Sequence, residues 1–451
     1  MGAMQTTRIL ILGGGFGGLY GALALEKTIG KSPGIEITLV NKENYFLFTP
    51  LLHEVAASDL DVTHTVNPLR VLLKRARFFN GEVDSIDLDR KTVLVSHGEE
   101  HHRHRLPYDY LLIALGSVTN FHDLPGEENA VTMKSLDDAI RLRNRLIALL
   151  EAADYDCQSG SRDPLLSVVV AGGGFAGVET VASVNDFFRA ALKRYPHVRN
   201  EMIRLVLVHA GEFILPELGE ALGAYARGKL AGRGVEVRTC TTVTSYSDGV
   251  AVLSDGTRIP AATLIWTAGI TPNPLLAALP CEKDHGRIVV DRFLEVPAYP
   301  GVWAVGDSAR VPDEAQGSFC PPTAQHALRQ GRVAARNIAA RVSGGTPRPF
   351  VYRSLGALAA IGHRCGVARV FGMNFSGFFA WWMWRTVYLG KLPRFEKKLR
   401  VALDWTLDLV FGKDLVQFEA HRVGATARTD SRMNVGPAAS PVAVSADDER
   451  A

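Results

Sequence analysis

Short apolar runs that lead into glycine-rich turns set the pattern of this chain. The run at residues 9–12 enters one such turn, and the run at 168–171 enters another. After each turn and a stretch of helical length, a second apolar run follows, at residues 35–40 and 204–208. Continuous apolar runs of this length are typical of strands buried on both faces of a parallel sheet. The pattern therefore predicts two strand–helix–strand units.

Both turns have the spacing G-x-G-x-x-G. The defining glycines are Gly13, Gly15 and Gly18 in the first turn and Gly172, Gly174 and Gly177 in the second. In such a turn the first glycine permits a tight bend, the second lets the backbone approach a pyrophosphate, and the third lets helix and strand pack closely. The helix N-terminus then offers its N–H groups to the phosphates. One such turn can be a plain connector, but two in matching positions predict two dinucleotides and hence a redox enzyme.

Further along the chain, the apolar pattern predicts a return to the first unit. A run at residues 110–114 extends the first unit, and Ser135 with Asp138 forms a capping box for a helix that continues to about residue 150. After the second unit, a run at 302–305 is typical of a strand, and a helix is expected over about 323–341. We assign these last elements to the first unit, so the second unit is inserted within it.

The region from residue 349 to about 422 has a different character. It holds four of the six tryptophans, and its eleven Lys and Arg against five Asp and Glu give a balance of +6. Two helical stripes are expected, one formed by Phe375, Phe378, Phe379, Trp382 and Leu389 and the other by Leu399, Leu403, Leu407 and Val410. Aromatic stripes more often pack in a core or a dimer contact, but basic amphipathic helices rich in aromatics also lie in membrane interfaces. We therefore expect this region to dock on a membrane surface.

Composition narrows the class of protein. The 451 residues are 47% hydrophobic and 22% charged, as in an ordinary globular chain with two or three domains. A net charge of +3 argues against nucleic-acid binding. No apolar run reaches the roughly 18 residues of a spanning helix, so a protein that touches a membrane would lie on it. The first strand begins too early to leave room for a signal peptide.

Cysteine and histidine content gives no metal or disulfide site. The five cysteines form no C-x-x-C pair, and their odd number suits a reducing compartment. His101, His102 and His104 form a cluster, but arginines are interleaved with them. A solvated hairpin tip is therefore the better interpretation, and no metal is expected.

Four segments resemble the type II NADH:quinone oxidoreductases, the single-chain, non-proton-pumping NADH dehydrogenases of the two-dinucleotide-binding flavoprotein superfamily. These segments are residues 44–56, 108–116, 172–179 and 321–331. The most specific are GGGFAGVE, which ends at Glu179, and PPTAQHALRQG, which holds Gln325 and Gln330. The resemblance covers roughly residues 8 to 420.

The resemblance implies an α/β fold with two Rossmann-like dinucleotide-binding domains and a C-terminal amphipathic helical region that docks on a membrane. Residues 1–120 and 285–348 would form an FAD-binding domain, and residues 121–284 an NADH-binding domain inserted in it. The membrane-associated region would cover residues 349–422, followed by a disordered tail over residues 423–451.

The resemblance also implies where the cofactors bind. The first glycine turn would hold the FAD pyrophosphate, Asp307 the ribityl chain, and residues 49–51 and Ala324 the edge of the isoalloxazine ring. Residues expected around FAD are Gly13, Gly15, Gly18, Asn41, Thr49, Pro50, Leu51, Val83, Gly116, Asp307 and Ala324. Those expected around NADH are Gly172, Gly174, Gly177, His209 and Gly269.

Three polar residues are implied at the reaction centre. Glu179 would lie near the flavin and nicotinamide, and Gln325 and Gln330 would line the quinone pocket. From the residues alone, Glu179 could instead be an acid in a first helical turn that interacts with the helix dipole. The two glutamines are five positions apart and do not share one helical face, so one could be buried and the other solvated.

Two positions depart from the usual pattern. An acidic residue commonly ends the second strand of such a unit and binds the ribose hydroxyls of adenosine. Asn41 and His209 stand at these places. Asn41 can still form hydrogen bonds, whereas His209 lacks the charge that would repel a 2′-phosphate. We expect a preference for NADH over NADPH, because His209 is followed by Ala210 and Gly211 and not by an arginine.

The function expected from these features is hydride transfer from NADH to FAD and then transfer of two electrons to a membrane quinone. The protein would be peripheral on the cytoplasmic face of the inner cell membrane, and a homodimer. A disulfide reductase is disfavoured because residues 44–57 lack cysteine. A sulfide:quinone oxidoreductase using Cys157 with Cys320 or Cys365, and a non-enzymatic flavoprotein regulator, remain alternatives.

Overall fold

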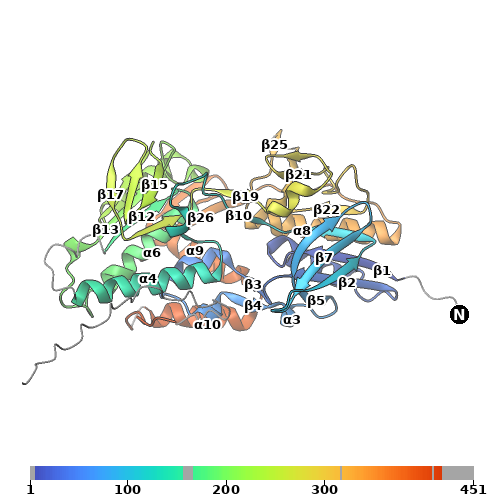
Figure 1. Cartoon of the computed structure of the whole chain (residues 1–451), viewed down its shortest axis with the longest axis horizontal. Helices are drawn as coiled ribbons and strands as arrows, with labels where there is room; N and C mark the ends of the chain where they lie inside the picture. The colour runs from blue at the N-terminus through green and yellow to red at the C-terminus, as the bar shows by residue number, and fades with distance from the viewer. Residues whose placement is uncertain (1–5, 156–165, 315–316, 409–410, 419–451) are drawn as a thin grey trace, which may run out of the picture. The chain divides into compact units, whose positions relative to one another are not determined.

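Two parallel five-stranded sheets organise the protein (Figure 1). The structure is a computed structural model that describes residues 6–155, 166–314, 317–408 and 411–418. The expected tail over residues 423–451 and Cys157 lie outside these residues. The described elements belong to one compact unit that ends at Gln417.

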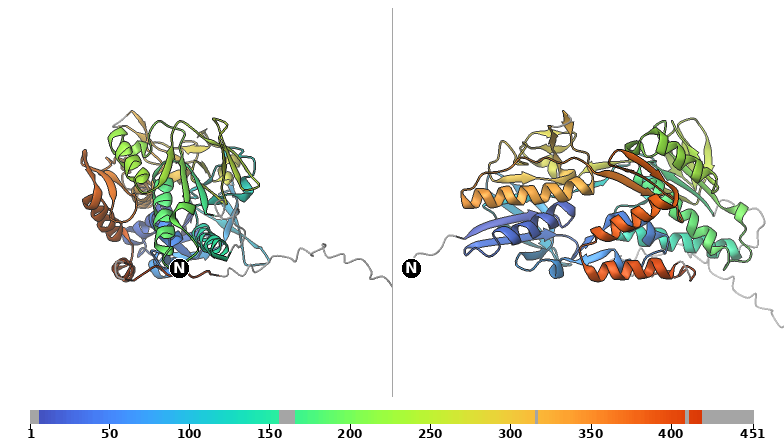
Figure 2. Two further views of the ribbon diagram at one scale, coloured as in Figure 1. Left: turned by 90° about the vertical axis from the view of Figure 1, so that its left-hand side faces the viewer. Right: turned by 180° about the vertical axis from the view of Figure 1, so that it is seen from behind.

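The first sheet combines strands from distant parts of the chain. Its order is β22-β9-β1-β2-β5, and every neighbouring pair is parallel. The strands are β1 (Thr7–Leu12), β2 (Ile35–Asn41), β5 (Arg77–Asn80), β9 (Tyr110–Ile113) and β22 (Val302–Ala304). Helix α1 (Phe16–Thr28) connects β1 to β2, and α8 (Ala324–Ser343) lies alongside α1 (Figure 2). The chain therefore returns to the first sheet after residue 300.

The second sheet is built entirely from the intervening segment. Its order is β11-β18-β12-β13-β14, again with parallel neighbours. The strands are β11 (Val131–Thr132), β12 (Ser167–Ala171), β13 (Arg204–Val208), β14 (Val235–Arg238) and β18 (Thr263–Trp266). The described α-helices of this segment include α4 (Leu136–Tyr155), α6 (Phe175–Ala191) and α7 (Glu220–Ala231). The predicted capping box is present at α4, since Ser135 and Asp138 each accept a backbone N–H from the other.

A three-stranded antiparallel sheet accompanies each parallel sheet, so the two halves share one plan. The first consists of β6 (Glu82–Asp87), β7 (Thr92–His97) and β8 (His102–Pro107), and the second of β15 (Val243–Ser247), β16 (Val250–Leu253) and β17 (Arg258–Pro260). The histidine cluster is exposed, but His102 and His104 lie in β8 and not at the hairpin tip. Within the described ranges, no three His, Cys, Asp or Glu side chains could together hold a metal ion.

Short elements complete the fold. They are β3 (Tyr45–Leu47), η1 (Thr49–Leu51), α2 (Leu52–Ala56), η2 (Val62–His64), β4 (Val66–Pro68), α3 (Leu69–Leu72), β10 (Ser117–Thr119), η3 (Glu127–Asn129), η4 (Asn200–Met202), η5 (Pro216–Leu218), β19 (Ile270–Pro272), η6 (Pro274–Ala278), β20 (Lys283–Asp284), β21 (Arg287–Val289), η7 (Gly306–Ser308), β23 (Ala309–Arg310), β24 (Pro312–Asp313) and β25 (Ser318–Phe319). The antiparallel pair β10–β19 carries the chain between the two halves.

The C-terminal region is a small sheet followed by two helices. It contains β26 (Gly356–Ala360), β27 (Gly366–Val370), β28 (Met373–Ser376), α9 (Gly377–Lys391) and α10 (Phe395–Leu407). The placement of Phe375 on a helical stripe is wrong, because it lies in β28, whose backbone pairs with β27. Val410 lies outside the described residues. In the part of the chain that the structure describes, no helix is both long and apolar enough to cross a membrane.

Helices α9 and α10 each have apolar side chains that are buried and others that are exposed. Trp381, Trp384 and Trp405 are buried. On the other side, Phe378, Phe379 and Trp382 of α9 are 50–61% exposed, and Leu399, Leu403 and Leu407 of α10 are 43–63% exposed. Exposed apolar side chains that repeat along a helix in this way are typical of surfaces that contact a partner or a membrane.

Candidate active site

The first glycine turn, between β1 and α1, exposes its backbone because its glycines carry no side chains. Gly13 has φ +99°, and a Cβ there would lie 2.2 Å from the Ala114 carbonyl oxygen. A Cβ on Gly18 would lie 1.8 Å from the Gly13 oxygen, so α1 packs directly on the turn. The Cβ position of Gly15, by contrast, meets no atom within 4 Å. A glycine that faces open space at this point leaves room for a phosphate against the helix N-terminus.

The second turn, between β12 and α6, repeats this geometry. Gly172 has φ +109°, and a Cβ on Gly177 would lie 1.8 Å from the Gly172 oxygen. The Cβ position of Gly174 again meets nothing within 4 Å. The chain therefore contains two matching cradles, each of which fits the pyrophosphate of a dinucleotide.

The residues at the ends of β2 and β13 both bind the turn beside them. Asn41 Oδ1 accepts a hydrogen bond of 2.7 Å from the Gly14 N–H. His209 Nδ1 accepts one of 3.2 Å from the Gly173 N–H. Burial lowers the pKa of His209, so the ring is neutral near pH 7 and its Nδ1 is free to accept.

A cavity of about 750 Å³ opens beside the second turn. Four of the five residues expected around NADH line it, namely Gly172, Gly174, His209 and Gly269. The remaining one, Gly177, packs behind the turn. The rest of the lining includes residues 121–124, 216–217, 241–244 and 266–268. The cavity lies at the carboxyl ends of β12, β13 and β18, where ligands bind in open parallel sheets.

Asp307 and Gly116 lie where the first sheet meets the second half of the chain. Asp307 Oδ2 accepts a hydrogen bond of 2.5 Å from Ser117 Oγ. Lys134 Nζ lies 2.6 Å from the same hydroxyl and 3.9 Å from Asp307 Oδ2. The Gly116 N–H donates to Ser308 Oγ at 3.0 Å. These contacts fix the turn after β22. No sequence motif pointed to Ser117 or Lys134, whose roles appear only in the folded chain.

The two glutamines of α8 occupy different environments. Gln330 is buried, and its Oε1 accepts a hydrogen bond of 2.8 Å from the Gly306 N–H, so it holds the turn that carries Asp307. Gln325 is partly exposed in the first turn of α8, next to Ala324. Its Oε1 accepts from Tyr352 Oη at 3.0 Å, and its Nε2 donates to the Gly356 oxygen at 3.2 Å.

The remaining residues expected around FAD lie in two elements of the first half, η1 and β6. Thr49 is exposed, Pro50 is half-buried and Leu51 is buried, all in η1. Val83 is buried in β6, opposite Val95 of β7. These positions follow from the pairing of β3 with β4 and of β6 with β7.

Glu179 is a buried carboxyl group bound by the C-terminal region. Its Oε1 accepts hydrogen bonds from the Ala360 N–H at 3.1 Å and from Trp384 Nε1 at 2.9 Å. Burial raises the pKa of Glu179 to about 8, against the opposing effect of these two donors. Glu179 therefore holds a proton in a large fraction of molecules at pH 7.

His53 and Glu54 of α2 extend this buried polar cluster. His53 Nδ1 lies 2.9 Å from Ser183 Oγ, and its Nε2 lies 3.8 Å from Glu179 Oε2. Burial lowers the pKa of His53 to about 3, so this contact is not an ion pair at neutral pH. Glu54 Oε2 accepts from Trp405 Nε1 at 2.8 Å, and burial raises the pKa of Glu54 to about 7. Both residues lie in the segment that carries the family resemblance, but their roles could not be assigned without the fold.

The chain thus has two dinucleotide cradles, one of which opens into a large cavity, and a buried carboxyl group bound by the C-terminal region. This combination is that of an oxidoreductase with two dinucleotide sites. Comparison with known proteins agrees. The family model for pyridine nucleotide-disulphide oxidoreductases matches residues 7–331, and that for the NDH2 C-terminal domain matches residues 354–414.

Several relatives match the chain over most of its length. A probable NADH dehydrogenase of Dictyostelium discoideum is 33% identical over 426 residues, which cover 92% of either chain. A type II NADH:quinone oxidoreductase of Mycobacterium tuberculosis is 33% identical over 417 residues, covering 89% of this chain and 87% of the relative. The structure of NDH2 from Plasmodium falciparum in complex with NADH shares the fold, with a TM-score of 0.83 at 21% identity, over 91% of this chain and 100% of that one. The chain belongs to the type II NADH:quinone oxidoreductases.

Proposed function

We propose that the chain oxidises NADH and reduces a membrane quinone through bound FAD, without pumping protons, and that the two glycine turns divide the cofactors between them. The observation that carries this proposal is the pair of matching turns with open space at Gly15 and Gly174. FAD, when bound, accepts a hydride from NADH and releases electrons to an acceptor, and the protein positions the partners.

The first turn holds FAD. Gly13, Gly15 and Gly18 cradle the pyrophosphate, Asp307 binds the ribityl chain, and residues 49–51 with Ala324 border the ring. Ser117 and Lys134 orient the Asp307 carboxylate, since both contact its Oδ2. Gln330 supports the same turn from beneath through the Gly306 N–H. Asn41, Val83 and Gly116 complete the walls of this site.

The second turn holds NADH in the 750 Å³ cavity, with Gly172, Gly174 and Gly177 at its pyrophosphate and Gly269 and His209 in the walls. This assignment places residues 1–120 and 285–348 in the FAD-binding domain and residues 121–284 in the NADH-binding domain. The sheet topology supports this division, because β22, which follows residue 284 in the chain, pairs with β9 of the first sheet.

Glu179 and Gln325 act at the reaction centre. Glu179 holds a proton at neutral pH and delivers it during quinone reduction, since one proton from the medium is consumed for each NADH oxidised. The bonds from Ala360 and Trp384 aim its carboxyl group. Gln325, held by Tyr352 and the Gly356 carbonyl, presents its amide near the quinone. Gln330 serves the reaction centre indirectly, because it holds the turn that carries Asp307.

Residues 349–422 dock the enzyme on the membrane that contains the quinone. The exposed faces of α9 and α10 supply aromatic and leucine side chains, and the net charge of +6 in this region favours anionic lipid. The docked enzyme is peripheral on the cytoplasmic face of the inner cell membrane. It forms a homodimer in which part of the same apolar surface is shared between copies.

A spectroscopic titration tests the function. Purified protein should show a flavin spectrum that NADH bleaches and a soluble quinone restores. Bleaching by sulfide but not by NADH would instead identify a sulfide:quinone oxidoreductase. Bleaching by NADH without reoxidation by any quinone would identify a nucleotide-binding regulator.

A further inference from the structure

The wall of the nucleotide cavity beside His209 raises the question of how the enzyme distinguishes NADH from NADPH. The two differ only by a 2′-phosphate on the adenosine ribose, and an acidic residue at the end of the second strand commonly makes the distinction. His209 stands there and binds the Gly173 N–H through Nδ1. A neutral ring neither repels a phosphate nor forms an ion pair with one.

An acidic residue, Glu217, lines the same part of the cavity from the loop that follows β13. Glu217 lies in η5, lines the cavity, and is exposed. The loop that carries it is fixed to the glycine turn, since the Leu215 N–H donates to the Gly173 oxygen at 2.8 Å and Ile214, Leu215 and Leu218 are buried. Glu217 is also near enough to His209 for its negative charge to act on the ring. The fixed loop therefore places Glu217 in the cavity wall on the side of His209.

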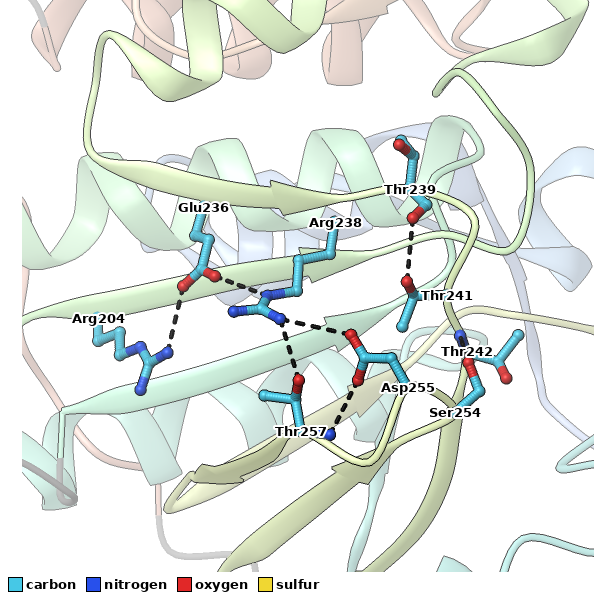
Figure 3. A network of polar contacts seen from close by, with 9 residues as sticks. All are labelled: Arg204, Glu236, Arg238, Thr239, Thr241, Thr242, Ser254, Asp255 and Thr257. Carbon is cyan, nitrogen blue, oxygen red and sulfur yellow. Dashed lines mark hydrogen bonds and ion pairs between the residues drawn. The ribbon is translucent and has the colours of Figure 1, made fainter.

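The arginine at the end of the neighbouring strand is occupied elsewhere (Figure 3). The His209 N–H donates to the Arg238 carbonyl oxygen at 2.8 Å, so Arg238 adjoins the site. Its guanidinium, however, contacts Glu236 Oε1 at 2.6 Å, Thr257 Oγ1 at 3.3 Å and Asp255 Oδ2 at 3.7 Å. Two carboxylates neutralise this cation and hold it away from a ligand.

The charges that line the cavity are consequently of one sign. Among the described lining residues there is no lysine or arginine, and the acids are Glu217 and Asp123. Asp123 belongs to the wall at residues 121–124, which adjoins Gly269 through His122. Glu217 is the acid on the side of His209.

We infer that Glu217 selects NADH over NADPH: its carboxylate accepts hydrogen bonds from the adenosine ribose hydroxyls and repels a 2′-phosphate. This inference rests on the proposed assignment of the second turn to NADH. It places the selective charge on the loop after β13, whereas the usual position is the end of the strand itself.

Calorimetric titration of the oxidised holoenzyme with NAD⁺ and with NADP⁺ tests the inference without any quinone reaction. The wild type should bind NAD⁺ more tightly. In Glu217→Gln, NAD⁺ binding should weaken by about threefold to tenfold, as for the loss of one hydrogen bond, and NADP⁺ binding should tighten by roughly fivefold. Glu217→Lys should bind NADP⁺ better than NAD⁺.

Two matched variants serve as controls. Glu212→Gln removes a charge from the same loop at an exposed position outside the cavity lining, and it should leave both affinities unchanged. Equal affinities for the two nucleotides in the wild type, or a loss of selectivity in Asp123→Asn but not in Glu217→Gln, would overturn the inference. Failure of the wild type to bind either nucleotide would instead overturn the assignment of the second turn.

Discussion

Trp384 of α9 donates a hydrogen bond of 2.9 Å from its indole Nε1 to the buried carboxyl oxygen Oε1 of Glu179. The two residues are 205 positions apart in sequence. The bond joins the helix after the second glycine turn to the helix that exposes Phe378, Phe379 and Trp382. The proposed membrane-docking region is thus also the part of the protein that holds the proposed proton-carrying residue in place.

Trp384→Phe should move the pH dependence of quinone reduction upward. The indole N–H stabilises the ionised form of Glu179, so its loss raises a pKa that already stands at about 8. If protonated Glu179 delivers the proton, flavin reoxidation slows as the pH rises through that pKa, and the variant keeps its rate to a higher pH. Stopped-flow reoxidation by a soluble quinone between pH 6 and about pH 10 measures the shift.

Trp382→Phe, an exposed change on the same helix, is the control. Identical pH profiles for Trp384→Phe and the wild type would contradict this role.

A valine in the first glycine turn and a valine in the second should disrupt the binding of different cofactors. Gly15→Val places a branched side chain in the open space of the first turn, and the protein should be purified without flavin colour. Gly174→Val should stay yellow, and its KM for NADH should rise steeply. Absorbance of the flavin and NADH oxidation kinetics distinguish the outcomes. A yellow Gly15→Val protein with full flavin content would show that the first turn does not hold FAD.

Gln325→Ala and Glu179→Gln should separate the half-reactions. Gln325→Ala removes an amide near the proposed quinone site, so flavin reoxidation should slow by roughly threefold to tenfold, as for one lost hydrogen bond, while reduction by NADH stays nearly intact. Glu179→Gln keeps the shape but cannot deliver a proton, so it should slow reoxidation without releasing FAD. Stopped-flow traces of each half-reaction provide the measurement. Wild-type rates in both halves for both variants would show that neither residue acts at the reaction centre.

Gln330→Leu should affect the hold on FAD more than the quinone reaction. The substitution leaves the Gly306 N–H without its acceptor, at a cost of about 1–3 kcal/mol when the group is buried. The turn that carries Asp307 should loosen, and FAD should be released at a lower temperature. Flavin fluorescence during heating measures this release. A normal release temperature combined with slow reoxidation would place Gln330 in the quinone pocket instead.

Phe379→Ser and Trp382→Ser should weaken binding to anionic liposomes while NADH oxidation with a soluble quinone persists. Both side chains are at least 50% exposed, so the fold should tolerate the change. Binding should also weaken with salt, because charges are screened within roughly 10 Å at 0.1 M. Cosedimentation with liposomes is the measurement, and Val71→Ser, on an exposed part of α3, is the control. Unchanged sedimentation of both variants would argue that the stripes serve a dimer contact.

What the sequence by itself determined was the local architecture. The apolar runs located β1, β2, β12 and β13 to within two residues, and the spacing of glycines located both turns. These features depend on neighbours in the chain, since a strand needs alternation or continuity of apolar residues and a tight turn needs glycine where φ is positive. Ser135 with Asp138 belongs to the same class of local signal.

What only the tertiary structure decided was the partner of each polar side chain. Glu179 binds Ala360 and Trp384, and Gln330 binds the Gly306 N–H, because β26, α9 and η7 are brought to them by packing that no short stretch of sequence encodes. Phe375 shows the same limit, since its spacing fits a helical stripe but pairing of β28 with β27 places it in a strand. A buried polar group must find a partner, and which partner it finds depends on the whole fold.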